Sequence, residues 1–168
     1  MNKLKLFLPI AFMCVLFVTD ALSQDCNYWY AEVGVKSANA KAGDKDKKNI
    51  QNIVEGIECL LKLEGDKTRG AFSGATHTRV SQMFPRATVE ICALYYISYL
   101  FYEKYDHANG IALRYKNYEE NRTINSDEAV KIAYESYRKW FEKVKEIGIE
   151  EARKQKLDPL ECSGVRWY

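Results

Sequence analysis

The sequence predicts an all-α fold, a small single-domain bundle of three to five helices stapled by two disulfides. Three long segments carry apolar residues at helical spacing, which indicates helices that bury one face or more. Four cysteines follow an N-terminal export signal, and exported chains most simply pair their cysteines. One arrangement open to such helices is the antiparallel pair that HEAT repeats stack, although no internal repeat is convincing.

Residues 1–23 are interpreted as a cleaved secretory signal. Two lysines form a short basic start, an apolar run of h-region length follows, and Ala21-Leu22-Ser23 supplies a small-x-small cleavage pattern. The apolar run is shorter than the roughly 20 residues that span a membrane as a helix. We therefore expect cleavage after Ser23, export to the periplasm or the extracellular space, and no stable membrane insertion afterwards. An uncleaved anchor is the alternative.

The remaining residues, 24–168, suit one domain with a hydrophobic core. The mature chain is close to neutral and has no basic stripe with interleaved aromatics, which argues against a nucleic-acid partner. No zinc-ligand spacing and no phosphate- or dinucleotide-binding glycine motif is present in the sequence. We therefore expect no cofactor and no metal. The oligomeric state stays open.

Two of the long segments lie in the first two thirds of the chain. Asp44–Glu64 places its aliphatic residues on one stripe and is followed by Gly65, a natural helix stop. Phe84–Tyr105 has a proline where the first helical turn tolerates it. This segment is hydrophobic nearly all round, which is typical of a helix buried between neighbours.

The third long segment, Ser126–Gly148, has the clearest helical pattern. Asn125 followed by Glu128 resembles a capping box, which begins a helix by satisfying its free N–H groups. One side of this helix is aromatic and aliphatic, and the other carries lysine and glutamate. Shorter helices are expected over Cys26–Ala42 and Ile149–Gln155.

The position of Cys59 favours one disulfide pairing. At 100° per residue, Cys59 falls away from the apolar stripe of its helix. A segment laid across that outer face would explain a cysteine there, and a chain end is the obvious candidate. We therefore favour Cys26–Cys59, which leaves Cys92–Cys162. The pairing Cys59–Cys92 with Cys26–Cys162 remains open.

Tyr95, Tyr99 and Tyr102 form an arc on the second long helix, apart from its aliphatic side. A phenol buries its ring but needs a partner for its hydroxyl. Such an arc therefore suits a surface that is partly buried and partly exposed to water. Packing beneath the C-terminal Trp167 and Tyr168 would explain it. The alternative is a groove or an interface, because tyrosines are enriched at protein recognition sites.

The segment Gly65–Pro85 is predicted to be a long loop. It holds three glycines and many hydrogen-bonding side chains, and loops of this length are commonly functional or mobile. Its cationic side chains could contact acidic or polar groups of a partner, and the phenols could add contact area. The candidate partner-binding residues are Arg69, His77, Arg79, Tyr95, Tyr99 and Tyr102.

The lack of catalytic motifs favours a non-enzymatic binding protein whose partner is another protein. The most specific version of this hypothesis is an inhibitor or immunity-type protein that blocks that partner. One alternative is a carrier or sensor of a small amphipathic ligand, which requires a closed and mostly apolar pocket beside the tyrosine arc. A second is a small secreted hydrolase that uses His77 or His107 beside a nucleophile and a carboxylate. We assign no catalytic residue.

Overall fold

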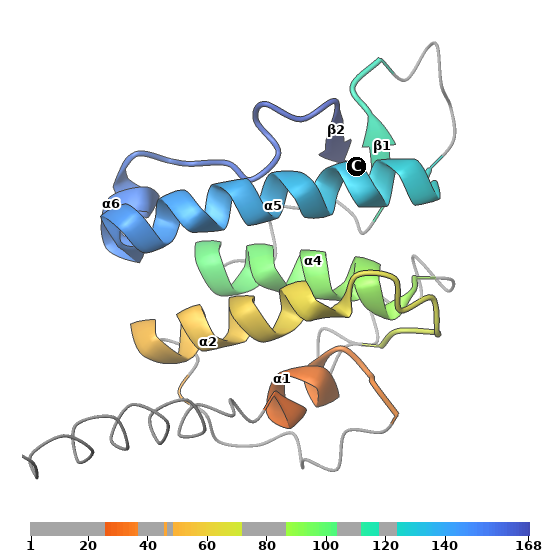
Figure 1. Ribbon diagram of the computed structural model, residues 1–168, viewed down its shortest axis with the longest axis horizontal. Coiled ribbons are helices and arrows are strands. Elements are labelled where there is room, and N and C mark those ends of the chain that lie inside the picture. The colour runs from red at the N-terminus through yellow and green to blue at the C-terminus, as the bar shows by residue number, and fades with distance from the viewer. Residues whose placement is uncertain (1–25, 37–45, 47–48, 72–86, 104–111, 118–123) are drawn as a thin grey trace, which may run out of the picture.

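The computed structural model describes residues 26–36, 46, 49–71, 87–103, 112–117 and 124–168. Within these residues the chain is mostly helical, which confirms the all-α class apart from one small sheet. Three long helices lie in layers, with α4 in the middle (Figure 1). They are α2 (Ile50–Leu60), α4 (Val89–Tyr102) and α5 (Asp127–Ile147).

Short elements complete the bundle. Helix α1 (Asn27–Glu32) packs on α2, and α6 (Ile149–Lys154) directly follows α5. The 3-10 turn η1 (Leu61–Leu63) prolongs α2. The predicted signal lies outside the described residues, so its cleavage stays a prediction. None of the described helices is both long and apolar enough to cross a membrane.

The direction of the helices differs between the two neighbouring pairs. Helices α2 and α4 run in opposite directions, whereas α4 and α5 run the same way (Figure 1). Lys67 contacts Glu90 at the start of α4 and Asp127 at the start of α5, so both helices begin beside one turn. Only α2 and α4 therefore have the antiparallel arrangement that HEAT-like pairs would need.

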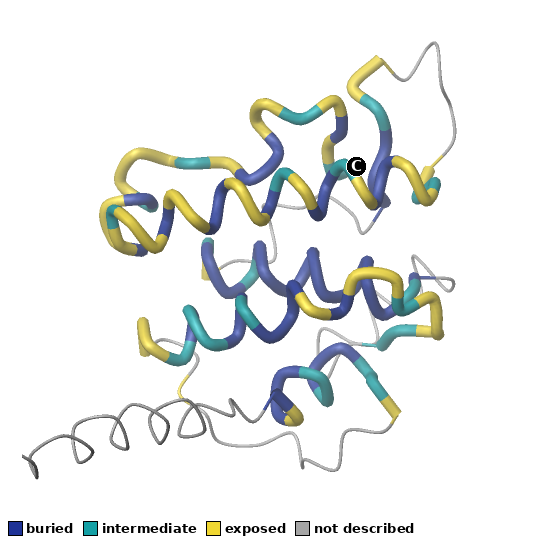
Figure 2. Tube along the Cα trace, viewed as in Figure 1, coloured by how far each residue is buried: buried dark blue, intermediate teal, exposed yellow. Residues whose placement is uncertain are grey.

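Helix α4 is buried on all sides, as its composition predicts. Twelve of its 14 residues are buried, and its trace is dark almost throughout in Figure 2. The helix begins later than predicted, because Thr88 is extended and forms a bridge with Arg69. The Gly70 N–H donates to Ala87 O at 3.0 Å, and the Val89 N–H donates to Thr68 O at 2.8 Å. Residues 84–86 lie outside the described part.

The other two long helices also begin where side chains satisfy their first N–H groups. Asn49 Oδ1 accepts from Gln51 N at 2.9 Å, so α2 starts after the predicted Asp44. The cap of α5 is Ser126, whose hydroxyl accepts from Ala129 N at 3.2 Å, and not the predicted Asn125. Asn125 instead adopts a positive φ of 52°.

A two-stranded sheet was not predicted. Strand β1 (Leu113–Tyr115) pairs antiparallel with β2 (Val165–Trp167), with Leu113 opposite Trp167. Each strand has three residues, which is too few for an alternating pattern to stand out. The pairing fixes the C-terminus beside the segment that precedes α5.

The predicted Cys26–Cys59 disulfide is present, with the two Cα atoms 5.4 Å apart. It ties α1 to the outer side of α2, as the position of Cys59 indicated. The predicted Cys92–Cys162 bridge is wrong, since both cysteines are free. A Cβ placed on Gly70 would lie 2.5 Å from Cys92 Sγ, so Gly70 fills the space beside that thiol. Cys162 is exposed.

Replacing Gly56 in α2 with alanine should destabilise the protein, although alanine is the better helix former by about 1 kcal/mol. A Cβ there would lie 2.9 Å from Leu100 Cδ1 and 3.1 Å from the Trp29 ring. Overpacking of this kind costs about 1–3 kcal/mol, so the contact outweighs the propensity. Urea unfolding followed by tryptophan fluorescence measures the change.

The matched control is Gly164→Ala, where a Cβ would meet no atom within 4 Å. This variant should unfold at the same urea concentration as the parent protein. A gain in stability from Gly56→Ala would contradict the close approach of α2 to α4.

Candidate functional site

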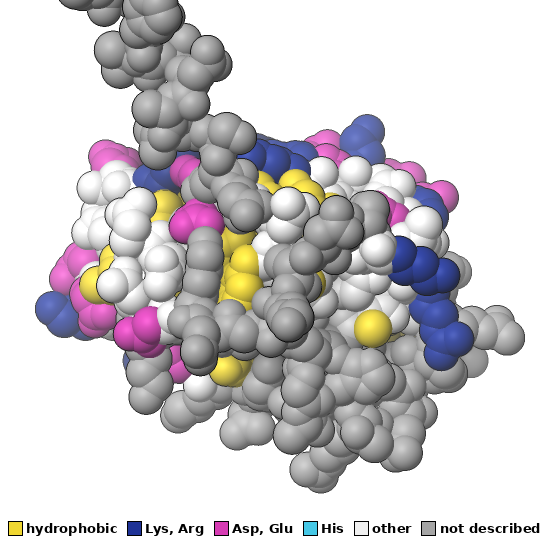
Figure 3. All heavy atoms as spheres, turned by 90° about the horizontal axis from the view of Figure 1, so that it is seen from below, with side chains coloured by type: hydrophobic (Ala, Val, Ile, Leu, Met, Phe, Trp, Pro, Cys, Tyr) yellow, Lys and Arg dark blue, Asp and Glu magenta, His cyan; other side chains and the backbone are white. Residues whose placement is uncertain are grey.

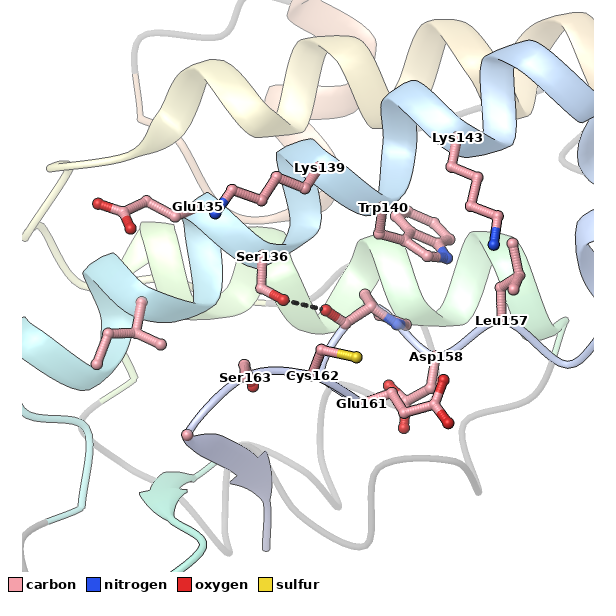
Figure 4. A pocket seen from close by; sticks show the side chains of 13 residues that line it. Glu135, Ser136, Lys139, Trp140, Lys143, Leu157, Asp158, Glu161, Cys162 and Ser163 are labelled. Atoms are coloured by element: carbon pink, nitrogen blue, oxygen red, sulfur yellow. Dashed lines mark hydrogen bonds between the residues drawn. The ribbon is translucent and has the colours of Figure 1, made fainter.

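An open groove of about 430 Å³ runs between the outer face of α5 and residues 157–164, which we name the C-terminal segment (Figure 4). Helix α5 supplies one wall with residues spaced along one side of the helix. The C-terminal segment supplies the other. The lining residues are Ile132, Glu135, Ser136, Lys139, Trp140, Lys143, Leu157, Asp158, Pro159, Glu161, Cys162, Ser163 and Gly164.

Side chains of both neighbouring helices hold the start of the C-terminal segment in place. The Tyr102 hydroxyl at the end of α4 donates to Leu157 O at 3.1 Å. The Ser136 hydroxyl on α5 donates to Pro159 O at 2.6 Å (Figure 4). A segment without regular structure needs such partners for its backbone carbonyls. The groove wall is thus fixed although it is neither helix nor strand.

Lys116, just after β1, holds the next part of the segment. Its Nζ donates to Leu160 O at 2.9 Å and to Glu161 O at 2.6 Å. The Ser163 hydroxyl lies 2.9 Å from Leu160 O and closes a local turn. Cys162 lies between these fixed positions, so its exposed thiol has a defined place on the groove wall.

The groove carries charges of both signs. Lys139 and Lys143 extend from α5, which also carries Glu135, whereas Asp158 and Glu161 lie on the C-terminal segment (Figure 4). Among the described residues, none of these five forms an ion pair within 4.0 Å. Elsewhere on the same helix, Lys145 pairs with Glu142 at 2.8 Å. The groove therefore has charges available for a ligand that bears both signs.

Trp140 lies between these charged walls and carries an unmet hydrogen-bond donor. Its side chain is only 7% exposed, and its ring packs edge-on against Phe101 with centroids 4.8 Å apart. Its Nε1 has no hydrogen-bond partner among the described residues. A buried donor left without an acceptor costs about 1–3 kcal/mol. The indole nitrogen points toward Leu157 on the opposite wall (Figure 4).

A second, smaller cavity of about 180 Å³ lies on the other side of Asp158 and Pro159. The Trp167 Nε1–H donates to the Tyr137 hydroxyl at 2.9 Å, and that hydroxyl lies 2.6 Å from Ser98 Oγ. Burial raises the pKa of the Tyr137 phenol, so the phenol stays protonated. Pockets that hold drug-sized ligands measure about 300–1,000 Å³. This cavity lacks the size and the apolar lining that the carrier hypothesis requires.

Two of the predicted tyrosines, Tyr95 and Tyr102, contact the C-terminal part of the chain. Tyr95 is 4% exposed, and its ring meets Trp167 edge-on with centroids 5.8 Å apart. Tyr99 and Tyr102 are half-buried. Packing of the arc against Trp167 is thus confirmed for Tyr95, and the Tyr102 hydroxyl holds the C-terminal segment.

The predicted loop residues lie elsewhere. Arg69 is exposed and bridges Thr88 beside the N-terminal end of α4, whereas Tyr99 and Tyr102 belong to the last turn of that helix. His77 and Arg79 lie outside the described residues, as does His107. Arg69 and the tyrosines at the far end of α4 therefore do not form one patch, and the hydrolase hypothesis stays a prediction.

The groove residues were given other roles in the sequence. Trp140 belongs to the aromatic and aliphatic side of the predicted Ser126–Gly148 helix, Lys139 belongs to its lysine and glutamate side, and Cys162 was predicted to form a disulfide. One signal was available: Lys139 and Lys143 are four residues apart, and like charges at this spacing destabilise a helix.

The face of the molecule that carries α1 lies away from the groove (Figure 1). Seen from the α1 side, described hydrophobic side chains show near the middle and charged ones gather toward the rim (Figure 3).

No group of three or more acidic, histidine or cysteine side chains that could hold a metal occurs within the described ranges. Comparison with protein-family models, curated proteins and solved structures finds no match for this chain.

Alkylation of the folded mature protein, residues 24–168, at pH 8 should modify one thiol, and alkylation in denaturant should modify two. Cys162 is exposed, whereas burial raises the pKa of the Cys92 thiol to about 12. The thiolate is the reactive form, so Cys92 stays unreactive at pH 8 until the fold opens. Mass measurement counts the labels, with Cys26 and Cys59 protected by their disulfide.

The control is Cys162→Ser, which should take up no label when folded and one when denatured. Two labels on the folded parent protein would show that Cys92 is accessible. No label in denaturant would show that the two thiols pair after all.

Proposed function

We propose that this protein is an exported, non-enzymatic binding protein that holds a segment of a partner protein in the groove along α5. An inhibitor or immunity-type protein would act in this way. The observation that carries the proposal is a groove with fixed walls that is lined by Trp140, whose buried Nε1–H has no partner among the described residues. A ligand that brings a hydrogen-bond acceptor to Trp140 would remove the cost of that buried donor.

A peptide segment suits the chemistry of the groove. Its backbone offers carbonyl acceptors at regular spacing, so one can reach Trp140 while its side chains reach the walls. Acidic side chains of the segment would pair with Lys139 and Lys143, and basic ones with Asp158 and Glu161. Complementary charges of this kind steer association and fix the register of a bound segment.

The fixed walls favour binding as well. Tyr102, Ser136 and Lys116 already hold the C-terminal segment by its carbonyls. A wall that is ordered before binding does not lose conformational freedom when the ligand arrives. The volume of about 430 Å³ lies within the usual range for ligand pockets.

Site-specific photo-crosslinking in the exported fraction of the source organism tests this proposal. A photo-reactive residue at Lys139, on the groove wall, should yield a crosslink to a single protein. The same residue at Lys131, which is exposed on α5 and does not line the groove, should yield none. A third probe at Arg69 tests the loop predicted from the sequence.

Three results would bear on the proposal. A crosslink from position 139 alone supports the groove. A crosslink from Arg69 alone moves the site to the Gly65–Pro85 loop and contradicts the groove. Equal crosslinks from positions 139 and 131 would show non-specific capture, which also contradicts it.

A further inference from the structure

We infer that Cys162 makes the groove a thiol-capture site, which forms a mixed disulfide with a cysteine-containing peptide bound between Trp140, Lys139 and Lys143. This inference rests on the proposed function and deepens it, since it names the chemistry of the bound segment. Its two supports are independent: an exposed free thiol on one wall, and a buried unmet donor between the walls.

Of the four cysteines after residue 23, only Cys162 can react in the folded state. Cys26 and Cys59 are joined in a disulfide. Cys92 is 1% exposed, and Gly70 lies against its thiol. Cys162 is exposed and lines the groove. An unpaired cysteine in an exported chain is commonly a reactive thiol or an intermolecular partner.

The surroundings of the thiol select among thiol compounds. The buried Trp140 Nε1–H points toward Leu157 (Figure 4), and it can donate to a peptide carbonyl or carboxylate that displaces the Leu157 side chain. Lys139 and Lys143 can hold carboxylates, and Asp158 and Glu161 can hold an ammonium group. A peptide with charges of both signs satisfies these groups together, whereas a small neutral thiol compound offers no charge to the lysines or the carboxylates.

The reaction is thiol–disulfide exchange and needs no oxidant beyond the peptide's own disulfide. The Cys162 thiolate attacks one sulfur of that disulfide, and a new S–S bond forms to this sulfur. The original S–S bond breaks, and the second sulfur leaves as a thiolate that takes up a proton. Cys162 is oxidised and the departing half is reduced, so electrons and atoms balance.

Glutathione disulfide, a charged peptide disulfide, is a suitable probe, and hydroxyethyl disulfide is the neutral reference. The folded mature protein is incubated with each at equal concentration, and the mixed disulfide on Cys162 is followed by mass. The quantity of interest is the ratio of the two rates. This ratio cancels the intrinsic reactivity of the thiol and reports recognition by the groove.

Trp140→Phe keeps an aromatic ring but removes the N–H, so the rate ratio should fall about five-fold, as expected for one lost hydrogen bond. Lys143→Ala, at an exposed position, should lower the ratio by a similar factor at low salt and less at high salt. The matched control Lys131→Ala should leave the ratio unchanged. The Cys162→Ser variant should form no adduct with either probe.

An unchanged ratio in both Trp140→Phe and Lys143→Ala would overturn the inference, because Cys162 would then be accessible without being part of a site. Lys143→Ala decides the matter if the tryptophan variant fails to fold. The crosslink from position 139, repeated in the Cys162→Ser background, separates the two proposals. If that crosslink persists while the rate ratio is unchanged, the groove binds a partner without capturing its thiol.

Discussion

The burial of α4 on all sides is the constraint on which the rest of the structure depends. A helix buried in this way must find a partner for each polar atom that it carries inward. The Tyr96 hydroxyl donates to Glu32 at 2.6 Å, which fixes α1. The Tyr134 hydroxyl of α5 donates to Glu90 O at 3.0 Å, and the Tyr102 hydroxyl fixes the C-terminal segment. Segments far apart in the sequence thus take their places from one helix.

The parallel course of α4 and α5 creates an electrostatic cost that local residues offset. Two helix N-termini side by side bring two partial positive charges together. Glu90 and Asp127 lie in the first turns and favour these ends. Lys67 then bridges both carboxylates at 2.6 Å, and its hydrogen bonds to Asp127 and Glu90 raise its pKa. At the C-terminal end of α4, where the partial charge is negative, the cationic Arg153 donates from Nε to Phe101 O at 2.7 Å.

A feature could be predicted from the sequence when it depends on residues that are close together in the chain. Helical spacing is local, so the long helices were found, and the angular position of Cys59 was enough to pair it with Cys26. The partner of Cys92 depends on how residues 68–71 pack, which no spacing reveals. The sheet depends on two three-residue strands that are distant in sequence. The groove has one wall without any periodicity, so only the fold shows that Cys162 lines a groove along α5.

The groove is itself a consequence of how α4 is covered. Trp167 must reach Tyr95 on α4, and β2 must pair with β1, so the end of the chain is fixed at one place. Leu157 is fixed at another, by Tyr102. Residues 157–164 must join these two places along the outer face of α5, where they lie opposite lysines that have no other partner in the described part of the chain. This course leaves Cys162 outside the core and Trp140 without an acceptor, so the packing that covers the tyrosines also forms the groove that we propose to bind a partner.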